Sequence, residues 1–136
     1  MAPLIHLPDY LRPVTSQVDV EAVCRVALDY ARACDMSEVA AAELRLICSE
    51  LATNLLDHAG GGTLSLAIAA ERDRRGVRIE AVDAGPGIVD VDLAMTEGYS
   101  TSGGLGQGLP LVRRLASTFE IASTPQGTRV VATKWA

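Results

Sequence analysis

Residues 77–88 read Val-Arg-Ile-Glu-Ala-Val-Asp-Ala-Gly-Pro-Gly-Ile, a stretch that changes from strand-like alternation to a glycine-rich turn. Its first residues alternate apolar with charged side chains, which is typical of a half-buried strand. Gly85 and Gly87 let the backbone turn sharply and approach a flat ligand closely. At the strand end, Asp83 can accept a hydrogen bond from an exocyclic amine such as that of adenine. Ordinary turns use the same residue types, so the stretch alone indicates either a turn or a base-binding loop.

The sequence on both sides of this stretch predicts helices and antiparallel strands. The predicted elements before it are short strands at 3–7 and 11–15, a helix from Val18 to Cys34 capped by Ser16, a helix from Ser37 to His58 ended by Gly60–Gly62, and a strand at 63–70 followed by the turn Arg72–Gly76. Those after it are a short helix at Asp90–Thr96, a third long helix that starts near Gly106 and carries Phe119 on its apolar face, and strands at 119–124 and 127–134 around the turn Pro125–Gly127. Elements in this order predict a two-layer α/β sandwich.

The composition favours one globular domain, residues 1–136, without a nucleic-acid or membrane partner. Hydrophobic residues make up 49% of the chain, which argues against disorder. The formal net charge of −5 disfavours a phosphate backbone as partner. No apolar run approaches the roughly 18 residues of a membrane span. The N-terminus lacks the pattern of a secretory signal, and the three cysteines lack metal spacing. We therefore expect buried free thiols and a cytoplasmic protein.

Glu50 and Asn54 form the first candidate chemical pair, on the predicted helix from Ser37 to His58. They are about 40° apart around the axis, and both lie at the border of the apolar stripe. The Asn54 carbonyl oxygen can coordinate Mg²⁺, which keeps several waters and needs few protein ligands. Glu50 can accept a proton from an attacking hydroxyl or water. An ordinary polar helix edge would show the same pattern.

Residues 103–109, Gly-Gly-Leu-Gly-Gln-Gly-Leu, open the third predicted helix. Free N–H groups at a helix start, without blocking side chains, can hold phosphate. The segment is not a dinucleotide-binding fingerprint, because no strand directly precedes it and no acidic residue follows about 20 positions later. It is not a P-loop either, since no Gly-Lys-Ser/Thr follows. A flexible loop is the alternative reading.

The three signals in this order resemble the N, G1 and G2 boxes of the GHKL ATPase and kinase superfamily, and Gly127-Thr128 resembles its final adenine-contacting threonine. The resemblance implies the Bergerat fold, a mixed, mostly antiparallel sheet with helices on one face, and implies ATP/ADP and Mg²⁺ as ligands. It assigns Glu50 as general base and Asn54 as metal ligand. It assigns nucleotide contacts to Asn54, Asp83, Gly85, Gly87, Ile88, Ser102, Gly103, Gly104, Leu105, Gly106, Gln107, Gly108, Leu109 and Thr128. In this reading the loop that includes residues 104–108 is a lid over the phosphates.

Residues 97–110 and the ending Ala132-Thr133-Lys134-Trp135 are similar to the bacterial serine/threonine switch kinases of the RsbT type. That likeness implies phosphorylation of a STAS-domain protein in a stress-signalling complex, followed by activation of a PP2C-type phosphatase. His58, four residues after Asn54, is more similar to the anti-sigma factor kinases of the RsbW type. The alternatives are therefore an anti-sigma factor kinase that binds a sigma factor, and a binding module that holds ATP without phosphotransfer. A sensor histidine kinase fragment is disfavoured, because neither histidine lies on a plausible phosphoacceptor helix before Glu50.

Overall fold

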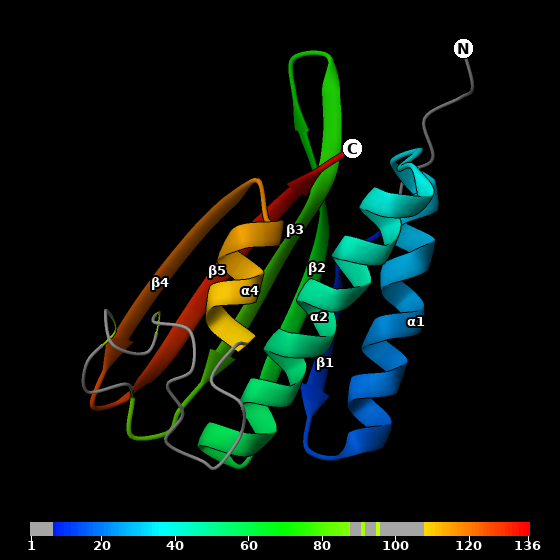
Figure 1. Cartoon of the computed structure of the whole chain (residues 1–136). Coiled ribbons are helices and arrows are strands. Elements are labelled where there is room, and N and C mark those ends of the chain that lie inside the picture. The colour runs from blue at the N-terminus through cyan, green and yellow to red at the C-terminus, as the bar shows by residue number, and fades with distance from the viewer. Residues whose placement is uncertain (1–6, 88–90, 92–94, 96–107) are drawn as a thin grey trace.

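The strands form one antiparallel sheet, covered on one face by helices, in a computed structural model that describes residues 7–87, 91, 95 and 108–136 (Figure 1). The elements are β1 (Tyr10–Val14), α1 (Gln17–Ala33), α2 (Glu38–Ala59), β2 (Gly62–Glu71), β3 (Arg74–Asp83), α4 (Gly108–Leu115), β4 (Thr118–Thr124) and β5 (Gly127–Trp135). The strand order is β1-β2-β3-β5-β4. The predicted α/β architecture is confirmed. Each neighbouring pair of described strands is antiparallel. The family resemblance implied a mixed sheet, but these described strands include no parallel pair.

The core lies between the helices and the sheet face that they cover. Alternate residues of the central strands are buried there, including Leu64 and Leu66 of β2, Ile79 of β3 and Ala132 of β5. This period of two is the pattern that identified the hairpin β2–β3 in the sequence. Among the described residues, no helix combines the length and the apolar character needed to cross a bilayer.

Helix α2 has the boundaries that its end signals predict. The Ser37 hydroxyl accepts a hydrogen bond from the Ala40 N–H at 3.1 Å, which satisfies one of the free donors at the helix start. The helix ends at Gly60, whose φ of 71° is the left-handed conformation that glycine adopts readily. Leu44, Ile47 and Leu51 are buried along one side. This side fixes the rotation of α2 and thereby the direction of its polar edge.

The start of α1 depends on Asp19. Ser16 occupies the predicted N-cap position. The Asp19 carboxylate accepts the N–H groups of Thr15 at 2.9 Å and Ser16 at 3.1 Å, and it pairs with the Arg12 guanidinium at 3.0 Å. The bonds from Thr15 and Arg12 lower the pKa of Asp19 to about 2. This cluster joins β1 to α1.

Four predicted boundaries need correction or fall outside the described residues. The strand at 3–7 is not observed at Leu7, and residues 1–6 are outside the described range. The predicted turn at Arg72–Gly76 is shorter, because Arg74 and its successors already pair with β2. The third long helix ends at Leu115, and Phe119 belongs to β4, where it packs against the core. Of the short helix at Asp90–Thr96, only Val91 and Met95 are described, and the Met95 N–H donates to the Val91 carbonyl at 3.0 Å, as in one helical turn.

The three cysteines are free and buried, as the sequence predicts. The Cys34 thiol donates to the Gly76 carbonyl at 3.3 Å. Burial raises the pKa of each thiol, so the cysteines pack as small apolar side chains.

Candidate nucleotide site

The first half of the site is the contact between the polar edge of α2 and the start of α4. Glu50 and Asn54 lie one turn apart on α2 and are half-buried. A Cβ atom placed on Gly108 would lie 3.0 Å from Glu50 Oε2 and 3.2 Å from Asn54 Oδ1. A side chain at position 108 would therefore displace both groups. The glycine lets the first backbone turn of α4 approach them directly.

Burial changes the chemistry of Glu50. Removal from water disfavours the ionised form and raises the pKa of this carboxyl group above its ordinary value of 4.5. A carboxylate with raised proton affinity is a better proton acceptor once it is ionised. This is the property expected of the general base that the sequence assigns to Glu50.

The second half of the site is the end of the sheet, where Asp83 closes β3. Its Oδ1 atom accepts the Gly85 N–H at 2.9 Å and the Thr128 N–H at 3.3 Å. Asp83 and Thr128 are also register partners in the β3–β5 pair. Both bonds use Oδ1, so the two N–H groups orient the carboxylate through one of its oxygens.

The loop after Asp83 packs closely against β4. Gly87 has a φ of 82°, and a Cβ at this position would lie 2.1 Å from the Thr124 carbonyl oxygen. The same atom would lie 3.0 Å from the Ser123 hydroxyl oxygen. Both the backbone conformation and the space therefore require glycine. The sharp turn predicted for this glycine agrees with its conformation, and the close approach that the structure shows is to β4. The predicted approach to a flat ligand stays a prediction.

Thr128 and Ser123 complete this end of the sheet. Thr128 is 8% exposed, and its hydroxyl oxygen lies 2.8 Å from that of Ser123. Sequence reasoning selected Thr128 and missed Ser123, which belongs to no glycine box. The sequence feature that could have revealed Ser123 is the short turn at Pro125. A tight turn there places Ser123 directly opposite Thr128.

The C-terminal half of α2 links the two halves of the site. Asn54 contacts the position of Gly108, and further along the helix Ala59 contacts the loop after Asp83, since a Cβ on Gly85 would lie 3.0 Å from the Ala59 Cβ. Leu109, a predicted nucleotide contact, packs against the core. The remaining predicted contacts lie outside the described residues; they are Ile88, Ser102, Gly103, Gly104, Leu105, Gly106 and Gln107.

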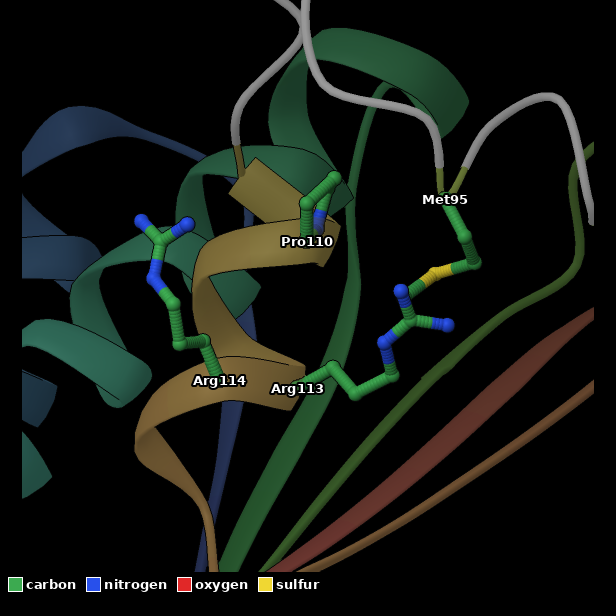
Figure 2. A pocket seen from close by; sticks show the side chains of 4 residues that line it. All are labelled: Met95, Pro110, Arg113 and Arg114. Carbon is green, nitrogen blue, oxygen red and sulfur yellow. The ribbon is translucent and has the colours of Figure 1, made fainter.

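A separate hollow lies on the flank of α4. Figure 2 shows its lining residues Met95, Pro110, Arg113 and Arg114, with the Arg113 side chain directed toward Met95 and Arg114 directed to the other side of the helix. None of the site residues described above lines it. We therefore do not assign it to the nucleotide site.

Residues 14–134 match the family described as the histidine kinase-like ATPase domain. The chain belongs to this family. It is also 37% identical over 123 residues to the serine/threonine-protein kinase RsbT of Bacillus subtilis (strain 168), across 90% of this chain and 92% of that protein. This relationship confirms the predicted family and the enzyme class of a protein serine/threonine kinase, for which ATP is the phosphate donor.

Solved structures of other proteins share the fold. The mycobacterial sensor histidine kinase MprB superposes with a TM-score of 0.57 at 17% identity, over 93% of this chain and 97% of that chain. A structure of the SiaB–SiaC complex from Pseudomonas aeruginosa gives 0.57 at 14% identity, with coverage of 96% and 90%. The catalytic domain of the histidine kinase ThkA gives 0.55 at 14% identity, with coverage of 92% and 95%. At these identities the likeness concerns the fold alone.

Proposed function

We propose that this chain transfers the γ-phosphoryl group of Mg-ATP to a serine or threonine of a STAS-domain protein in the cytoplasm. In the proposed pathway, its release from that partner activates a PP2C-type phosphatase. The observation that supports the proposal most directly is the 37% identity, across 90% of the chain, to a relative that is itself a serine/threonine-protein kinase. The contact of Glu50 and Asn54 with the start of α4 supplies a base and a metal ligand for the chemistry.

The residues of the site fit a nucleotide with its cation. The Asp83 carboxylate is the acceptor for the exocyclic amine of adenine. Asn54 offers one oxygen beside the N–H groups at the start of α4, where phosphate is favoured. Among the described residues, no group of three or more His, Cys, Asp or Glu is arranged to hold a metal. The cation would thus take most of its ligands from phosphate and water, as Mg²⁺ commonly does.

The proposed reaction divides the work between positioning and proton transfer. Bound Mg-ATP supplies the phosphoryl group and neutralises charge as the group is transferred. Gly108 brings the backbone of α4 to the two polar side chains of α2. Glu50 accepts the proton of the attacking hydroxyl. General-base catalysis of this kind typically accelerates a reaction by about 10²–10⁴-fold.

The test is phosphotransfer to a purified STAS-domain protein encoded near this chain. The chain and the STAS protein are incubated with γ-labelled ATP and Mg²⁺, and the expected result is label on a serine or threonine. The control is the same STAS protein with the labelled residue replaced by alanine. Phosphoserine and phosphothreonine survive acid, whereas phosphohistidine does not, so acid treatment separates this reaction from that of a histidine kinase. Binding of ATP without labelling of any STAS protein would contradict the proposal and favour an ATP-binding module.

A further inference from the structure

Helix α2 exposes two large apolar side chains on the side that carries Glu50. Val39 is 68% exposed and Leu46 is 43% exposed. Leu46 is four residues from Glu50, or about 40° around the helix axis, and Val39 is offset from Glu50 by only about 20°. Val39 and Leu46 therefore form a line along α2 that leads to Glu50. We call this pair the α2 stripe.

The stripe lies on the outer side of α2, whose other sides are covered. The sheet lies beneath this helix, with α1 on one side and α4 on the other (Figure 1). The first turn of α4 contacts Glu50 at Gly108. The last residue of α4, Leu115, is joined to Glu43 of α2 by the Lys134 ammonium group, which donates to both. These contacts follow one edge of the stripe and leave its two side chains exposed.

Single exposed apolar side chains are common on protein surfaces, so the alignment with Glu50 is the informative feature. In the proposed reaction the accepting hydroxyl comes within about 3 Å of the Glu50 carboxylate. The first turn of α4 closes one side of Glu50 at Gly108. A protein that brings its hydroxyl to Glu50 along the outer side of α2 therefore covers Leu46, which lies only about 6 Å away along the helix axis.

The charge beside the stripe indicates what such a protein presents. Arg45 is exposed and directly precedes Leu46 in the chain. Within residues 7–87, 91, 95 and 108–136, no carboxylate lies within ion-pair distance of Arg45, whereas the Glu43 carboxylate is already paired with Lys134 at 2.6 Å. A guanidinium group beside an exposed apolar side chain is complementary to a carboxylate beside an apolar side chain.

We infer that the α2 stripe, with Arg45 beside it, is the surface on which the phosphoacceptor protein docks, and that the matching surface of that protein is an apolar side chain next to a carboxylate. The inference rests on the proposed function, and it adds the surface that selects the partner. Val39 and Leu46 contribute affinity through apolar contact, and Arg45 orients the partner. The base then acts on a hydroxyl that docking has brought to it.

The experiment measures labelling of the STAS-domain protein that the wild-type chain phosphorylates, at varied concentrations of that protein. Leu46→Gln should lower kcat/KM for it at least about tenfold, as loss of a central interface side chain does. The loss should lie in KM, with kcat at saturating partner within about threefold and Mg-ATP affinity unchanged by calorimetry. Glutamine adds no charge beside Glu50 and is a good helix former, so the thermal midpoint should be maintained.

Val39→Gln tests the stripe at a distance from the chemistry. Val39 lies about 16 Å along the helix axis from Glu50, so it cannot act on the base directly. Its replacement should still raise KM for the partner about threefold or more and leave kcat unchanged. This second variant also keeps the test valid if Leu46→Gln does not fold.

Two further comparisons separate docking from a general effect of surface changes. Arg45→Gln should raise KM for the partner and reduce its dependence on salt, whereas Arg45→Lys keeps the charge and should retain most of that dependence. Leu11→Gln is the matched control for Leu46→Gln. Leu11 is 66% exposed on the sheet face opposite to the helices, and its replacement should change neither KM nor kcat.

Three outcomes would overturn the inference while the wild-type protein still labels its partner. An unchanged KM in both Leu46→Gln and Val39→Gln would mean that the partner docks elsewhere. A fall in kcat alone would mean that Leu46 only supports Glu50. Self-association of the wild-type protein that Leu46→Gln abolishes, seen by analytical ultracentrifugation, would assign the stripe to a second copy of this chain. Failure of the wild-type protein to label any STAS protein would instead contradict the proposed function, and the inference would fall with it.

Discussion

At the scale of single residues, the burial of Glu50 predicts how the rate of phosphotransfer depends on pH. Its pKa is raised because the half-buried carboxyl group loses water. Glu50 must be ionised to accept a proton, so the rate of phosphotransfer should fall as the pH drops through a pKa above 4.5. Single-turnover rates at saturating ATP and partner check this. The acidic limb should vanish in Glu50→Gln, and an identical limb in that variant would assign it to another group.

The same raised pKa predicts that Glu50→Gln does not unfold the protein. A carboxyl group whose pKa is higher in the folded state than in the unfolded state destabilises the fold progressively as the pH rises through that pKa. Glutamine removes this cost. At pH 7 the variant should therefore have a free energy of unfolding, measured in urea, at least equal to that of the wild-type protein.

Asp83 predicts the outcome of a second conservative change, Asp83→Asn. Asparagine keeps an oxygen for the N–H groups of Gly85 and Thr128, but it places an amide donor where the adenine amine needs an acceptor. Loss of a hydrogen bond to a charged group costs about 1.5–3 kcal/mol, or roughly tenfold to a hundredfold in affinity. Calorimetry should show this weakening for ADP and ATP alike. Normal affinity in Asp83→Asn would remove the adenine assignment.

At the scale of elements, the approach of α4 to α2 is tested by Gly108→Ala. The added Cβ would meet Glu50 Oε2 and Asn54 Oδ1 at 3.0 and 3.2 Å, and both side chains must then move. Small displacements of catalytic groups cost up to about 10²-fold, so we expect phosphotransfer to fall at least about tenfold. The thermal midpoint of unfolding is measured beside the rate, because a fall in activity without a fall in the midpoint places the effect in the site. Unchanged activity would show that this contact does not position the chemistry.

The end of α4 is held by Lys134. Its ammonium group donates to Glu43 of α2 at 2.6 Å and to the Leu115 carbonyl at 2.8 Å, and its side chain is only 14% exposed. Lys134→Met should lower the free energy of unfolding in urea by about 1–3 kcal/mol, because a partly buried carboxylate and a helix-end carbonyl lose their donor. Arg129→Met removes the more exposed ion pair with Glu80 and should cost less than about 1 kcal/mol. Equal losses of stability in the two variants would mean that Lys134 does not stabilise the packing of α2, α4 and β5.

At the scale of the whole molecule, the sequence predicted those features that local chemistry determines. Helix α2 was predicted because Ser37 caps it and Gly60 ends it, and both roles depend on neighbouring backbone. The length of α4 was not predicted correctly, because Phe119 continues the apolar spacing of the helix. Phe119 instead pairs with Ala132 of β5, and this pairing depends on a distant segment of the chain. The turn before Gly76 was misplaced for a similar reason. Gly76 lies inside β3, where a Cβ would meet the Lys134 carbonyl oxygen at 2.4 Å.

The site shows the same division between local and distant information. The glycine boxes, Glu50 and Asn54 could be selected from their order and spacing, whereas the contact of Gly108 with α2 and the pairing of Ser123 with Thr128 required the arrangement of separate elements. Family membership is established over residues 14–134. The role of each site residue is a prediction that the variants above test.

The most direct test of the central claim is phosphotransfer by Glu50→Gln, measured together with its affinity for Mg-ATP. The variant keeps the shape of the side chain and removes the charge. We predict Mg-ATP affinity within a few-fold of the wild-type value, and labelling of the STAS partner slowed at least about a hundredfold, the lower range of general-base catalysis. Labelling at the wild-type rate would show that Glu50 is not the base and would contradict this account.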